Sequence, residues 1–101
     1  MVRHVILWKM KADLTNEESN RVKSDIKREL EALKGVIPGL LEIFVGTDPL
    51  ETSNADLFLD SLFEDRDALA VYADHPAHVK IKDDLVVPNV QERMCMDFEI
   101  K

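Results

Sequence analysis

The residues best suited to proton chemistry lie in one short stretch, which runs Tyr72-Ala-Asp-His75-Pro76-Ala-His78. It combines a phenol with two imidazoles, and a neutral imidazole is the usual general base near pH 7. Proline lacks an N–H and has a fixed φ, so Pro76 is expected to end one helix and to open the next. His75 then falls at the N-cap of the second helix, and His78 falls in its first turn.

The position of His78 favours the neutral imidazole. The positive end of the helix dipole disfavours a protonated ring there by roughly 0.3–1 kcal/mol. Asp97 is placed to accept a hydrogen bond from this ring and fix its tautomer, although a carboxylate would raise the pKa. We therefore expect Tyr72 and His78 to face one pocket, with His78 mostly neutral at pH 7. The alternative is structural: His75 only caps its helix and His78 only packs.

Other polar residues add candidate ligands but no established cofactor motif. His4 lies on the same strand face as Ile6 and Trp8, so it is a candidate ligand-binding residue together with His75 and Asp97. His75 and His78 are three apart, but the break at Pro76 spoils simple metal-binding geometry on a helix face. We therefore expect no metal and no cofactor. Neither a phosphate-binding loop nor a dinucleotide fingerprint is present.

Composition limits the classes of partner. A chain of 101 residues suits one domain, residues 1–101, and a formal net charge of −7 argues against nucleic acid and against anionic membrane surfaces. No apolar run has the length of a membrane span. The single cysteine, Cys95, cannot form an intramolecular disulfide and fits the reducing cytoplasm, where its simplest role is that of a small strand residue.

The elements that would hold these side chains follow from local patterns. Strands are expected over residues 2–11, 40–47, 56–64 and 93–100, where apolar residues alternate or run together. A capping box, Thr15 with Glu18, opens a helix whose apolar stripe ends near Gly35. Asp65 is the expected N-cap of the helix that carries Tyr72.

The order β-α-β-β-α-β predicts an α+β, ferredoxin-like fold with a four-stranded antiparallel sheet. Two helical segments cover only one face of such a sheet, yet the first three strands carry apolar residues on both faces. In the second strand we place Val45 with Ile43 on one face and Leu40 with Phe44 on the other. An apolar open face predicts a homodimer packed sheet against sheet, with Ile43 or Val45 at the contact.

The sequence also resembles the stress-responsive A/B barrel (Dabb) family of the dimeric α+β barrel superfamily. The stretch from Tyr72 to His78 carries the resemblance most clearly, together with four further segments: Arg3-His4-Val5-Ile6-Leu7-Trp8-Lys9, Ile37-Pro38-Gly39, Phe63-Glu64-Asp65 and Met96-Asp97-Phe98. The resemblance implies a homodimeric α+β barrel with a cavity either between each sheet and its own helices or between the two sheets.

Two functions remain open at this point. The first is a protein of uncharacterised activity that binds a small apolar organic molecule. The second is an enzyme, cyclase-like or monooxygenase-like. Some plant members of the family resemble polyketide cyclases, and that resemblance implies His78 as the base and Tyr72 as the donor that polarises a carbonyl oxygen. The strand over residues 56–64 supplies only apolar groups at Leu57 and Phe58, which departs from a polar cyclase pocket.

Overall fold

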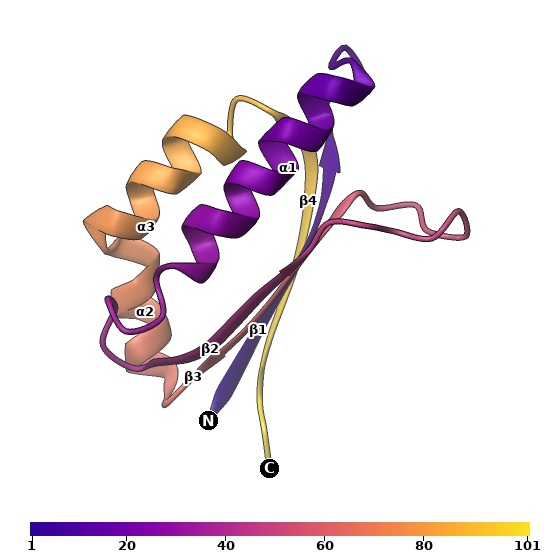
Figure 1. Ribbon diagram of the computed structural model, residues 1–101. Coiled ribbons are helices and arrows are strands. Elements are labelled where there is room, and N and C mark those ends of the chain that lie inside the picture. The colour runs from indigo at the N-terminus through magenta and orange to yellow at the C-terminus, as the bar shows by residue number, and fades with distance from the viewer.

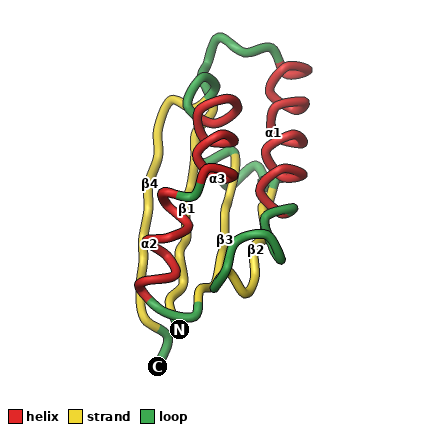
Figure 2. The backbone as a smooth tube through the Cα atoms, turned by 90° about the vertical axis from the view of Figure 1, so that its left-hand side faces the viewer, coloured by secondary structure: helices red, strands yellow, loops and turns green.

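The computed structural model describes residues 1–101 and confirms the four-stranded antiparallel, ferredoxin-like fold. The sheet has the strand order β2-β3-β1-β4, and all three helices lie on one side of it (Figure 1). Helix α1 runs along the β2 side, whereas α2 and α3 run toward the β4 side (Figure 2). The elements are β1 (Val2–Met10), α1 (Asn16–Glu31), β2 (Leu40–Gly46), β3 (Leu57–Phe63), α2 (Arg66–Asp74), α3 (Pro76–Ile81), the π-helical turn η1 (Lys82–Val86) and β4 (Val90–Glu99).

Helix α1 begins at the predicted capping box, in which Thr15 and Glu18 satisfy each other's backbone N–H groups. Its apolar stripe buries Ile26 and Leu30 against the sheet. The charged face is more than a solvated surface. Glu31 accepts a hydrogen bond from the backbone N–H of Val45 at 2.9 Å, and Lys27 donates to the Val45 carbonyl at 2.7 Å. This ion pair therefore occupies the free N–H and C=O of Val45 on β2, which is an edge strand.

The side chains of strand β2 do not alternate between the two faces of the sheet as the sequence predicts. Its pairing with β3 shifts between Leu40 and Glu42, as in a β-bulge. The extra residue lets Leu40 and Val45 both enter the core under the helices, and Ile43 packs against the same core. The placement of Leu40 with Phe44 is therefore wrong. Neither Ile43 nor Val45 reaches the open face, so neither can lie at a contact between two sheets.

The open face of the sheet is apolar, as the sequence predicts. Leu7 on β1 is opposite Met94 on β4, and Val5 is opposite Met96. Met94 and Met96 are 71% and 65% exposed, although methionine is an apolar side chain. Phe44 and Phe98 add exposed aromatic rings to the same sheet. The Arg3–Asp60 ion pair lies on the same face, and exposed apolar residues gathered in this way mark an interaction site. No helix is long and apolar enough to cross a bilayer.

Two glycines have positive φ, and one of them fixes the position of α2. Gly35 follows α1 with φ 86°, and Gly39 precedes β2 with φ 83°. A Cβ at Gly39 would lie 2.5 Å from the Cβ of Ala68, in the first turn of α2. The Gly39 carbonyl also accepts a hydrogen bond from the Glu64 N–H at 3.0 Å. Close approach at Gly39 therefore brings the helix that carries Tyr72 down onto the sheet.

Candidate functional site

A cavity of about 440 Å³ lies between the sheet and the helices. Its floor is the even-numbered side of β1, because successive strand residues point to opposite faces. Its roof comes from α2, α3 and η1. Most of its lining is apolar. The residues of this wall that carry polar groups are His4, Trp8, Tyr72, His78, Lys82, Gln91, Glu92, Arg93 and Asp97.

Tyr72 lies at the centre of an aromatic cluster at this cavity. Its ring stacks on His78 at 4.1 Å between centroids and meets Phe63 edge-on at 5.0 Å. The residue is 1% exposed, and its hydroxyl has no hydrogen-bond partner within the chain. Burial raises the pKa of Tyr72 far above its usual value. Tyr72 is therefore a neutral phenol with an unused donor at neutral pH.

His78 is held by the backbone of the preceding helix. Its Nδ1–H donates to the carbonyl of Ala73 at 3.3 Å, which leaves Nε2 as the acceptor of the neutral ring. Burial lowers the pKa of His78, and the positive charge of Lys82 acts in the same direction. The neutral form is thus favoured by desolvation first, a cause that sequence reasoning did not weigh.

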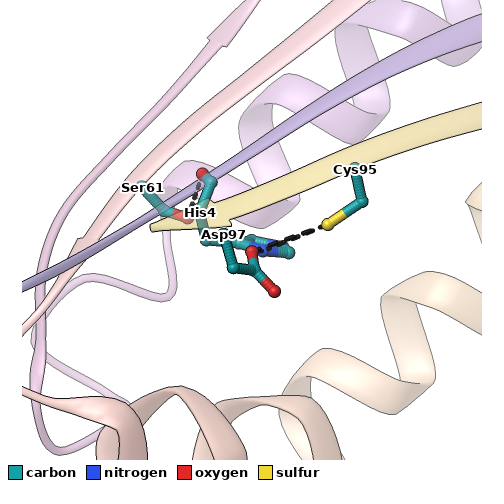
Figure 3. Close-up of polar contacts among 4 residues, drawn as sticks. All are labelled: His4, Ser61, Cys95 and Asp97. Atoms are coloured by element: carbon teal, nitrogen blue, oxygen red, sulfur yellow. Dashed lines mark hydrogen bonds and ion pairs between the residues drawn. The ribbon is translucent and has the colours of Figure 1, made fainter. Parts of the chain in front are cut away.

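Asp97 does not contact His78, so the expected hydrogen bond between them is wrong. Its Oδ1 accepts instead from Nδ1 of His4 (Figure 3). The reason is the register of β4 on β1, in which Asp97 is the direct cross-strand partner of His4. This pairing depends on how two strands at opposite ends of the chain align, which no local pattern reveals.

His75 caps helix α3, which is the purely structural role that the sequence offered as the alternative. Its Nδ1 accepts from the backbone N–H of Ala77 at 3.1 Å, at the N-cap of α3. It is not among the residues that line the cavity. Of the five residues that the sequence proposes for a site, His4, Tyr72, His78 and Asp97 share the cavity wall, and His75 does not.

Sequence reasoning missed two contributors. Trp8 lines the cavity and is 4% exposed, yet its Nε1–H has no partner in the chain. The sequence placed Trp8 on the same strand face as His4, but it could not show that the Trp8 Nε1–H lacks a partner. Cys95 lies close to both His4 and Asp97, and its i, i+2 spacing from Asp97 on one strand was the available signal. Burial and the Asp97 charge raise the pKa of the Cys95 thiol.

The lowered pKa of His78 predicts a pH dependence of stability. The unfolded chain, with a histidine pKa near 6.5, then binds more protons than the folded chain in the window below that value. The free energy of unfolding should therefore fall as pH falls below about 6.5. His78→Phe keeps an aromatic ring against Tyr72 and should flatten this part of the curve, measured by urea denaturation between pH 7.5 and pH 5. An unchanged slope in the variant would show that other groups cause the loss.

Comparisons with known proteins agree with this geometry. A family model described as the stress responsive A/B barrel domain matches residues 2–100. A stress-response A/B barrel domain-containing protein of Arabidopsis thaliana is 33% identical over 97% of this chain. The chain spans only 36% of the length of that curated relative.

Solved structures match almost the whole chain. A dimeric protein of unknown function and ferredoxin-like fold from Bacteroides fragilis is 30% identical, with a TM-score of 0.92 over 98% of this chain and 95% of that one. A hydroxynitrile lyase from Passiflora edulis has a TM-score of 0.79 over 99% and 93% of the two chains. It is only 16% identical, so this second likeness concerns the fold alone.

Proposed function

This chain belongs to the stress responsive A/B barrel domain family, and we propose that it binds a small, largely apolar organic molecule in the cavity between its sheet and its helices. The volume of about 440 Å³ lies within the range of small-molecule sites. An apolar lining with a few convergent polar groups is also typical of such sites.

The observation that carries the proposal is a pair of unused hydrogen-bond donors. Tyr72 Oη and Trp8 Nε1 are the buried side-chain polar atoms without a partner, and both residues line the cavity. Leaving such a group unsatisfied costs roughly 1–3 kcal/mol. A ligand that brings a carbonyl or ether oxygen would remove part of that cost. The ligand class is therefore an apolar body that carries at least one acceptor.

The proposal includes assembly as a homodimer. The Bacteroides fragilis protein and a ferredoxin-like protein from Thermobifida fusca are both described as dimeric. A surface suited to such a contact lies on the open face of this sheet, where the exposed apolar residues are Leu7, Phe44, Met94, Met96 and Phe98.

We also assign the chain to the cytoplasm, because a reducing compartment suits the free thiol of Cys95.

Binding is preferred here over catalysis. The carboxylate expected to support His78 as a base pairs with His4 instead, so the Ala73 carbonyl is the partner left to orient the His78 ring. Tyr72 and His78 still stack beside the cavity, so a cyclase-like or monooxygenase-like reaction remains the alternative for the same pair. No observation at this site favours that alternative over binding.

A matched pair of probes tests the role of the unused donors. We expect 2-acetylnaphthalene to bind about tenfold more tightly than 2-ethylnaphthalene, because only the ketone offers an acceptor, and about 1.4 kcal/mol is a factor of ten. Trp8 is the only tryptophan and lies in the cavity wall, so quenching of its fluorescence reports binding.

Tyr72→Phe should remove most of this preference while leaving binding of the ethyl probe unchanged. Its free energy of unfolding should equal or exceed that of the parent, because an unpartnered buried hydroxyl is lost. Val71→Ala, one residue away and 50% exposed, is the matched control. Equal affinities of the two probes for the parent protein would refute recognition by these donors.

A further inference from the structure

Three side chains with metal-binding atoms converge beside the cavity, and two of them, His4 and Asp97, line it. The three are His4 on β1 and Cys95 and Asp97 on β4 (Figure 3), and one ligand atom from each lies within 4.8 Å of the other two. We infer that His4, Cys95 and Asp97 form a binding site for a transition-metal dication, with zinc the best match to the three ligand types.

The spacing of the atoms fits tetrahedral coordination. Zinc bonds of about 2.0–2.3 Å at tetrahedral angles place neighbouring ligand atoms about 3.3–3.6 Å apart. Cys95 Sγ lies 3.7 Å from His4 Nδ1 and 3.5 Å from Asp97 Oδ1. The third pair, His4 Nδ1 and Asp97 Oδ1, is hydrogen-bonded and would separate as the metal replaces the shared proton.

The sheet holds the three residues in place. His4 and Asp97 are direct cross-strand partners, and Cys95 projects from the same face of β4 two residues earlier. The hydroxyl of Ser61 donates to the backbone carbonyl of His4 at 3.1 Å, which adds a bond from β3. His4 itself is 7% exposed, so its ring has little freedom. A site on paired strands is more precisely fixed than one on loops.

The mixture of ligands selects the kind of metal. Imidazole and thiolate together favour zinc and similar dications, whereas magnesium and calcium prefer oxygen ligands alone. The Cys95 thiol must lose its proton to solvent when the metal–sulfur bond forms, and the shared proton of His4 and Asp97 must also leave. Apparent affinity should therefore increase with pH.

Three protein ligands leave a tetrahedral zinc with an open position, as in catalytic rather than structural sites. Two of the three ligands, His4 and Asp97, line the cavity, so the site borders it. The sequence favours no metal, because the only histidine pair within one segment is interrupted by Pro76. The cluster arises instead from strands at opposite ends of the chain. This inference does not depend on whether the cavity binds an organic ligand.

The test uses Co²⁺ alone, added to the reduced full chain after treatment with a chelator. We expect a thiolate-to-cobalt charge-transfer band in the near ultraviolet that saturates at one metal per chain, and zinc should then displace the cobalt. Cys95→Ser should abolish the band. Asp97→Asn should weaken cobalt binding by more than about 100-fold, since loss of an outer-shell partner alone costs roughly 10- to 100-fold.

Glu99→Gln is the matched control, because Glu99 is an acid on the same face of β4 that pairs with Arg66 outside the cluster. It should leave cobalt affinity unchanged. Circular dichroism should show that each variant remains folded. A parent protein without the band, or a band that survives Cys95→Ser, overturns the inference. A cobalt affinity that Asp97→Asn does not alter excludes the carboxylate as a ligand and overturns the three-residue site.

Discussion

Leu7→Asp should weaken self-association of the chain by at least about 100-fold. Leu7 lies on a central strand, on the face that no helix covers, opposite Met94 of β4. In a dimer packed sheet against sheet, the new carboxylate would be buried without a partner, and such burial costs several kcal/mol. In the isolated chain Leu7 is already 40% exposed, so the fold itself should be little affected.

Sedimentation equilibrium at micromolar concentration measures this effect. Val36→Asp is the control, because Val36 is 56% exposed in the turn after α1 and the change adds the same charge away from the sheet. It should leave the dimer intact. A parent protein that is a folded monomer under these conditions, or two variants with equal dissociation constants, would contradict a contact through the open face.

Gly39→Ala should lower the free energy of unfolding by roughly 2–5 kcal/mol. A left-handed φ costs an L-residue about 1–2 kcal/mol, and overpacking adds typically about 1–3 kcal/mol. The added Cβ would lie 2.5 Å from the Cβ of Ala68, and a methyl group on a helix cannot rotate away. Because Ala68 belongs to the helix that carries Tyr72, the variant should also bind 2-acetylnaphthalene less tightly.

Gly35→Ala separates backbone strain from steric conflict. Gly35 has nearly the same φ, 86°, but a Cβ there would meet nothing within 4 Å. It should therefore cost only the conformational part, about 1–2 kcal/mol, and leave probe binding unchanged. Urea denaturation of the two variants gives the difference directly. Equal losses would mean that the contact with Ala68 relaxes at no cost.

Local signals in the sequence predicted most of the fold. The capping box of Thr15 and Glu18 and the N-cap at Asp65 each depend on residues a few positions apart, and both appear as expected. The bulge that brings Leu40 into the core depends on pairing with β3, which local alternation does not report. For the same reason, the expectation that Ile43 or Val45 lies at the dimer contact was wrong, because Val45 is buried under the helices.

In the candidate site, too, features set by nearby residues were predicted and features set by distant pairing were not. Tyr72 and His78 are neighbours along two short helices, so their shared position at the cavity followed from Pro76 and helical spacing. The partner of Asp97 was wrong because strand register is set by contacts across the whole sheet. The unused donors of Tyr72 and Trp8 could not be predicted, because the lack of a partner is a property of the finished packing.

Strand β1 specifies two surfaces within one run of residues. His4, Ile6 and Trp8 line the cavity, while Arg3, Val5 and Leu7 occupy the other face. A substitution can therefore alter ligand chemistry or association separately. An insertion or deletion of one residue would exchange the two sets at once, because side chains alternate with a period of two. Among relatives, β1 should accordingly vary in residue type but not in length, with changes in length confined to segments such as the loop over residues 47–56, which extends away from the body (Figure 1).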